Sequence, residues 1–164
     1  MSQIAKRLAE LGVTLPAPAA PVANYVPFVR AGGAAPGAPA QLWISGQLPL
    51  GPDGKLADRH KGKLSPDSAI EPAREAARLA AINVIAQAQA ALGDLDKIVR
   101  VVRLGGFFNV ASAFDALPQA MNGASDLMVE VFGERGRHAR STVGVAHLPL
   151  GALAEVEAVF ETAP

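Results

Sequence analysis

The sequence ARSTVGVAH occupies residues 139–147, and AEVEAVFE occupies residues 154–161. Both stretches predict β-strands, and in the second one apolar and polar residues alternate over 154–158. Successive side chains of a strand point to opposite faces of the sheet. The alternation therefore puts Arg140 and Thr142 together on one face of the first strand, and it puts Glu155 on the polar face of the second.

The connection between these two strands sets the distance between their charged side chains. A turn through residues 148–151 predicts a hairpin with Glu155 opposite about Ala146. Arg140 then lies about 20 Å from Glu155, at about 3.3 Å per residue. Two side chains cannot close that gap around a small acid, so a site that uses both needs them from different subunits. The alternative is a solvated sheet face whose ion pairs contribute under about 1 kcal/mol each.

The rest of the chain predicts an α+β fold. The pattern indicates a helix over 2–12, strands over 25–30, 41–46 and 97–104, and long helices over 71–92 and 118–133. Gly105-Gly106 is expected to end the third of these strands. A mainly antiparallel sheet with the two long helices on one face satisfies this order.

Segments rich in proline, glycine and alanine divide the chain. Residues 14–23 contain three prolines and are expected to form an extended tether. Residues 31–40 are expected to form a flexible insertion in a hairpin, and residues 47–70 a loop. The predicted organisation is an N-terminal helix and tether over 1–23, followed by one domain over 24–164.

The composition disfavours several classes of protein. The 164 residues include 15 basic and 15 acidic side chains, so no long-range attraction to nucleic acid or to an anionic membrane is expected. There is no cysteine, which excludes disulfides and cysteine-ligated metals. His60, His138 and His147 lack a zinc-binding spacing, so no metal is expected. No membrane span or secretory signal is evident, and a cytoplasmic location is expected.

Three motifs follow one another along the chain. They are YVPFV at residues 25–29, ISGQLP at 44–49, and GRHARSTVGVAHLP at 136–149 followed by EVEA at 155–158. Asn83 lies in the first long helix. Together these features resemble the RidA/YjgF family of reactive-intermediate (enamine/imine) deaminases. The extra N-terminal helix resembles a longer, divergent branch of that family.

The resemblance implies a chorismate-mutase-like fold with a ferredoxin-like βαβ arrangement, assembled as a homotrimer with clefts between subunits. The family's carboxylate-binding arginine falls on Arg140, and the glutamate that positions the attacking water falls on Glu155. The residue types suit these roles, because a guanidinium fork holds a carboxylate in one orientation. A carboxylate near an imine carbon can align water and move a proton.

The resemblance also implies substrate contacts at five further positions. The pocket tyrosine falls on Tyr25, and the contacts at the cleft floor fall on Ser45 and Gly46. Asn122 matches an asparagine of the second long helix. Thr142 stands where the family commonly carries a cysteine, so it keeps a hydrogen-bonding group but loses the thiol.

The implied activity is hydrolytic deamination of 2-aminoacrylate-like enamines and 2-imino acids to 2-keto acids and ammonia. This is the reaction of a 2-iminobutanoate/2-iminopropanoate deaminase, and it needs no cofactor. The implied partners are a small substrate with a carboxylate and further copies of the chain. Ala76 and Leu79 replace glutamines found in many members, which favours an alternative: a trimeric protein that binds 2-keto acid-like ligands without turnover. RNA cleavage is disfavoured by the zero net charge and the eight aromatic residues.

Overall fold

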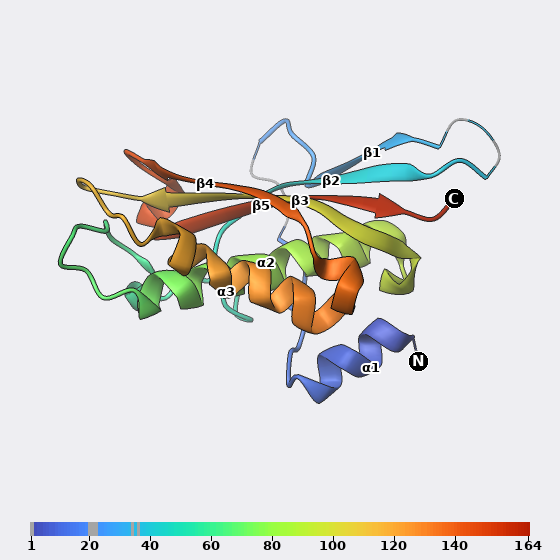
Figure 1. Cartoon of the computed structure of the whole chain (residues 1–164), viewed down its shortest axis with the longest axis horizontal. Coiled ribbons are helices and arrows are strands. Elements are labelled where there is room, and N and C mark those ends of the chain that lie inside the picture. The colour runs from blue at the N-terminus through green and yellow to red at the C-terminus, as the bar shows by residue number, and fades with distance from the viewer. Residues whose placement is uncertain (1, 20–22, 34, 36) are drawn as a thin grey trace.

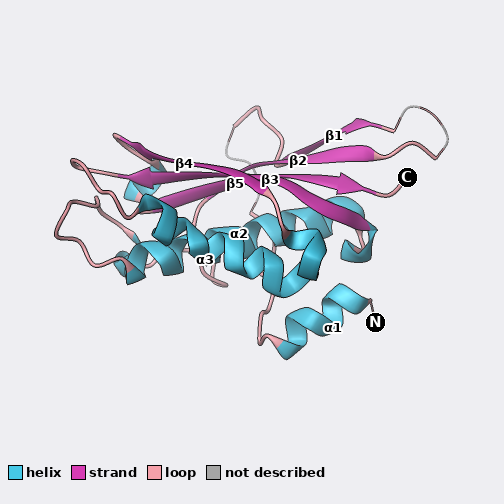
Figure 2. Ribbon diagram, in the orientation of Figure 1, coloured by secondary structure: helices cyan, strands magenta, loops and turns pink. Residues whose placement is uncertain are grey.

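The structure is a computed structural model that describes residues 2–19, 23–33, 35 and 37–164. A five-stranded sheet forms one layer, and two long helices pack on one of its faces (Figure 1). A short third helix lies outside them (Figure 2). In chain order the elements are α1 (Gln3–Glu10), β1 (Phe28–Gly32), β2 (Ala40–Gln47), α2 (Glu71–Leu92), β3 (Ile98–Asn109), α3 (Leu117–Phe132), β4 (Ala139–Val145) and β5 (Ala154–Thr162). The predicted order of helices and strands is confirmed.

The sheet is mixed, with the strand order β1-β2-β5-β3-β4. Three neighbouring pairs are antiparallel, whereas β3 and β4 run parallel. The predicted hairpin between the last two strands is therefore wrong, because β3 lies between them. Glu155 pairs with Phe107 of β3 rather than with Ala146. The many buried residues of β3 explain its position inside the sheet, where strands pair with it on both edges. The residues of β4 are mostly exposed, which suits its position at the edge of the sheet.

The end predicted for β3 at Gly105-Gly106 is also wrong, because the strand continues to Asn109. Both glycines are buried beneath side chains. A Cβ built on Gly105 would lie 2.6 Å from Cγ of Glu157, and one built on Gly106 would lie 3.0 Å from Cε of Met121. These glycines therefore make room for neighbouring side chains inside the strand and do not end it.

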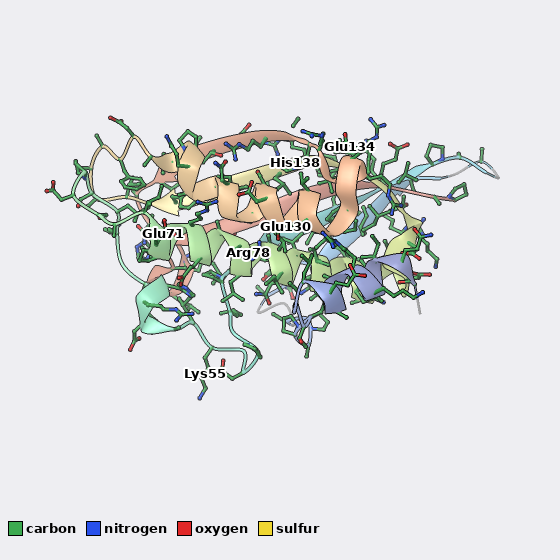
Figure 3. All side chains as sticks on the ribbon, turned by 60° about the horizontal axis from the view of Figure 1, so that its bottom comes forward. Lys55, Glu71, Arg78, Glu130, Glu134 and His138 are labelled. Carbon is green, nitrogen blue, oxygen red and sulfur yellow. The ribbon has the colours of Figure 1, made fainter. Side chains whose placement is uncertain are left out.

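Small residues bring α2 close to its neighbours. Its fully or almost fully buried alanines are Ala73, Ala76, Ala77, Ala80, Ala81, Ala86 and Ala88. On α3, a Cβ built on Gly123 would lie 2.9 Å from the carbonyl carbon of Arg74, so only glycine permits this approach. Ion pairs join the two helices: Arg74 Nη2 lies 3.0 Å from Asp126 Oδ2, and Arg78 Nη2 lies 2.8 Å from Glu130 Oε2. Figure 3 labels Arg78 and Glu130 on these neighbouring helices.

Parts of the predicted tether and insertion, residues 20–22, 34 and 36, lie outside the described residues. The first strand begins at Phe28 and not at Tyr25, so the tyrosine belongs to the segment that leads into β1. None of the described helices has the length and apolar character needed to cross a membrane. Within the described part of the chain, no cluster of three or more histidine or acidic side chains is placed to hold a metal ion.

Candidate functional site

A cavity of ≈ 300 Å³ opens beside Glu155 at the start of β5. Three parts of the chain line it: the segment before β1 with Ala19 and Tyr25, the end of β2 with Gly46, and the loop between β4 and β5 with Leu150. Most of the lining side chains are apolar. The volume lies at the lower end of the range for small-molecule pockets. The fold thus brings together Tyr25, Gly46 and Glu155, three of the residues selected from the sequence.

The Glu155 carboxylate lies in a partly desolvated position. Burial raises the pKa of Glu155 above its ordinary value of 4.5, and the nearby Glu157 carboxylate raises it further. A Cβ built on Gly46 would lie 2.8 Å from Cδ of Glu155, so the bare Cα of Gly46 leaves room for the carboxylate. Arg103 pairs with Glu157, at 3.0 Å between Nη1 and Oε1. A carboxyl group with a raised pKa is suited to accept a proton and give it back.

Ser45 holds the segment that carries Tyr25. Its hydroxyl donates a hydrogen bond to the carbonyl of Val26 at 2.8 Å, and its backbone N–H donates to the carbonyl of Pro27 at 2.9 Å. Tyr25 remains 49% exposed at the cavity. In this chain the Ser45 hydroxyl therefore fixes the cavity wall, and Tyr25 can meet a ligand or a neighbouring molecule.

Arg140 projects from β4 toward α3, on the helix side of the sheet. Nη1 donates to Asn122 Oδ1 at 2.9 Å and to Ser125 Oγ at 3.1 Å, and Nη2 donates to the carbonyl of Pro118 at 3.1 Å. These bonds use three of the five N–H donors of a guanidinium. Among the described residues the N–H of Nε and the second N–H of Nη2 have no partner, and two such neighbouring donors can match a carboxylate. The helix therefore orients Arg140 with its side edge available to an anion.

His138 supports this arrangement through Ser125. Its Nδ1 lies 2.6 Å from the carbonyl of Gly136, and its Nε2 lies 3.0 Å from Ser125 Oγ. The carbonyl can only accept, so Nδ1 carries the proton and the Ser125 hydroxyl donates to Nε2. Burial lowers the pKa of His138, with a further contribution from the Arg140 charge. Because the Ser125 hydroxyl hydrogen points to the neutral His138, a lone pair of the Ser125 oxygen is free to accept the hydrogen bond from Arg140.

Thr142 lies two residues beyond Arg140 on the same face of β4. Among the described residues its Oγ1 is buried without a hydrogen-bond partner. A buried hydroxyl without a partner is uncommon in proteins. Asn122, matched from the sequence, lies beside Arg140 and accepts a hydrogen bond from it. Pro118 and Ser125 were missed, although the spacing 118, 122, 125 on one helix face would indicate them.

Within one chain, Arg140 and Glu155 cannot meet around a small ligand. Glu155 pairs with Phe107 on β3, and Phe107 pairs with Val143 on β4. The two residues are thus two strands apart and offset by three residues, which gives about 14 Å between their Cα atoms. Their side chains also point to opposite faces of the sheet, because Arg140 contacts α3 while Glu155 shares the face of Glu157. The distance predicted from the hairpin was longer, but the conclusion for a single chain is the same.

Comparison with known proteins assigns a family. A family model described as "YjgF/chorismate_mutase-like, putative endoribonuclease" matches residues 5–162. Protein TCP17 of Trypanosoma cruzi is 46% identical over 160 residues, which cover 97% of this chain and 94% of that protein. This match extends over most of the N-terminal segment, so α1 is not peculiar to this chain.

Solved structures agree with this assignment. A Shewanella oneidensis protein that carries the same endoribonuclease description superposes with a TM-score of 0.87 at 38% identity, covering 98% of this chain and 99% of that one. RidA from the Antarctic bacterium Psychrobacter sp. superposes with a TM-score of 0.58 at 26% identity, covering 90% and 94%. The chain belongs to the RidA/YjgF family, in a divergent branch that includes the N-terminal helix.

Proposed function

We propose that this protein hydrolyses 2-imino acids and their enamine tautomers. In this reaction water adds to the carbon of the C=N bond, the C–N bond breaks, and a 2-keto acid and ammonia leave. The observation that carries the proposal is the pair of preorganised groups: a carboxyl of raised pKa in an apolar cavity, and a guanidinium with one free fork. Both stand at positions that the family's motifs assign to the reaction.

Arg140 would bind the carboxylate of the substrate. The fork of Nε and Nη2 fixes the substrate plane, while Asn122 and Pro118 prevent the guanidinium from turning away. Holding a substrate in a reactive orientation can supply several kcal/mol of the barrier reduction.

Glu155 would place the attacking water. Its ionised form accepts a proton as water adds to the imine carbon, and its protonated form returns the proton to the leaving nitrogen. The raised pKa makes the carboxylate a stronger base and so favours its acceptance of the proton in the first step. An imine carbon is already electrophilic, so the reaction requires placement of the water more than its activation.

One site would then draw Arg140 and Glu155 from two copies of the chain, as in the homotrimer that the family resemblance implies. The sheet face opposite the helices supports self-association, because it exposes apolar side chains. Val29, Trp43 and Val143 on this face are 46–52% exposed. Exposed apolar groups gathered on one face are typical of a surface that another molecule covers.

Two other activities are less supported. Binding of 2-keto acids without turnover uses the same guanidinium, and the absence of ammonia release would select it. RNA cleavage is named in the description of the family model. The chain has a net charge of zero, so it lacks the positive charge that attracts a protein to phosphate backbones.

The test is an assay with an imino acid generated in place by an L-amino acid oxidase, with semicarbazide as a competing trap. We expect the protein to accelerate ammonia release and to reduce semicarbazone formation at substoichiometric concentration. Thermal stabilisation by the matching 2-keto acid without any such acceleration would contradict catalysis and support the binding protein.

A further inference from the structure

The N-terminal segment forms part of the cavity beside Glu155. Ala19 lies on the cavity wall, although it is far from Glu155 in the sequence. The start of this segment is fixed to the domain, since the Asp96 carboxylate accepts hydrogen bonds from the backbone N–H groups of Gln3 and Ile4 at 2.8 and 2.9 Å. Ile4 and Leu8 are buried against the core. Residues 3–19, here called the strap, are thus attached at their beginning.

A buried glutamine attaches the strap again at its end. Gln87 of α2 is only 2% exposed, and its Nε2 donates to the carbonyl of Ala19 at 2.8 Å. The same nitrogen lies 3.5 Å from Oε1 of Gln47. Buried side-chain amides are costly unless they form hydrogen bonds, so their positions are well defined.

Gln47 continues this connection to the catalytic region. It is 8% exposed, and its Nε2 donates to the carbonyl of Ser45 at 2.9 Å and to that of Gly46 at 3.3 Å. Gly46 is the residue whose missing side chain leaves room for Glu155. Two buried amides therefore connect Ala19 to the backbone beside the Glu155 carboxylate.

The remaining wall of the cavity is apolar and includes an unusual residue. Leu150 has a φ of 57°, the left-handed region that leucine rarely adopts, and its side chain is 69% exposed at the cavity. Leu48, Leu50 and Pro149 complete this wall. An apolar wall favours an apolar ligand group and offers no partner to a charged one.

We propose that the strap, held by Gln87, shapes a subsite for the substrate's side chain and selects 2-imino acids with bulky apolar side chains. This inference rests on the proposed function for its substrate class. Gln87 is a positioning residue, because it acts through Ala19 and Gln47. Ala19 is a specificity-determining residue, because a larger side chain there fills the subsite.

The test compares an imino acid derived from leucine with one derived from alanine. We expect wild-type protein to prefer the leucine-derived substrate in kcat/KM. Ala19→Leu is expected to lower that preference by about tenfold or more with little change for the small substrate, since one or two methylene groups in an apolar pocket discriminate by about this amount. Gln87→Leu is expected to lower the preference through a higher KM for the bulky substrate.

Gln89→Leu is the matched control on the same helix, because within the described part of the chain Gln89 donates only to the local carbonyl of Gly93. It is expected to leave the preference unchanged. A preference within about twofold of wild type in both Ala19→Leu and Gln87→Leu, with folded protein in each case, would overturn the inference.

A binding measurement distinguishes a failure of this inference from a failure of the proposed function. If no imino acid is turned over, titration calorimetry with 4-methyl-2-oxopentanoate and pyruvate measures the same selectivity. Tighter binding of the bulky keto acid that is lost in Ala19→Leu supports the subsite even though catalysis fails. Turnover without any dependence on the strap refutes the subsite alone, and failure to bind either keto acid refutes both.

Discussion

Arg140→Ala is expected to lower kcat/KM for imino acid hydrolysis by about 10²–10³-fold, because the substrate carboxylate loses its oriented partner. Arg140→Lys keeps the charge but not the fork, so a loss of about tenfold or more is expected. Steady-state kinetics with the coupled oxidase assay measures both. The folded state is expected to persist, since the Arg140 side chain is exposed and bonded only along one side of α3.

Arg137→Ala is the matched control for this prediction. Arg137 precedes β4 by two residues, is exposed, and pairs locally with Glu134 at 2.9 Å between Nε and Oε2. It is expected to keep activity within about twofold of wild type, as exposed ion pairs contribute little. Equal losses in Arg137→Ala and Arg140→Ala would indicate a general effect of charge and would remove the assigned role of Arg140.

Glu155→Gln is expected to lower kcat by about 10²–10⁴-fold, the range for loss of a positioned acid–base group. Binding of a 2-keto acid is expected to persist, because Arg140 is unchanged. Glu161→Gln is the control, since Glu161 lies further along β5 and pairs with Arg100 at 3.6 Å between Oε2 and Nε. Full turnover by Glu155→Gln would be incompatible with the proposed mechanism.

The same variant has an expected effect on stability. The pKa of Glu155 is raised in the folded chain, so folded protein binds more protons than unfolded chain at pH values between 4.5 and the raised pKa. The contribution of Glu155 to the free energy of unfolding is therefore present below pH 4.5 and is lost as the pH rises through the folded pKa. The amide of Glu155→Gln does not ionise, so the free energy of unfolding of this variant does not fall in this way as the pH rises. We expect a higher midpoint of urea unfolding than wild type at neutral pH, and equal midpoints at pH 4 or below.

The local features of the candidate site could be predicted from the sequence. A period of two residues is a property of the strand itself, so the shared face of Arg140 and Thr142 did not depend on which strands pair. The face of Glu155 relative to Arg140 did depend on it, because the predicted pairing with Ala146 implies the same face, whereas the observed pairing with Phe107 places Glu155 on the opposite one. Asn122 could be placed beside Arg140 only through the family's motifs. The pairing itself could not be predicted, because Leu148–Gly151 looks like a hairpin turn whether or not another strand lies between.

The contacts that depend on distant parts of the chain could not be predicted. Gln87 donates to a carbonyl 68 residues earlier, and a glutamine on a helix usually indicates a solvated side chain. Gly105-Gly106 has the composition of a strand end, and only the positions of Glu157 and Met121 explain why the strand continues. The division into a tether over 1–23 and a domain over 24–164 stays a prediction.

The most direct test of the central claim is complementation between two inactive variants. Arg140→Ala and Glu155→Gln proteins are unfolded together and refolded as a 1:1 mixture, so that mixed particles form. Each chain then supplies the group that the other lacks, and random assembly restores about a quarter of the sites if every site takes Arg140 from one chain and Glu155 from its neighbour. The account predicts recovery of about a quarter of wild-type activity in the mixture. No recovery, in particles that native mass spectrometry identifies as mixed, would contradict it.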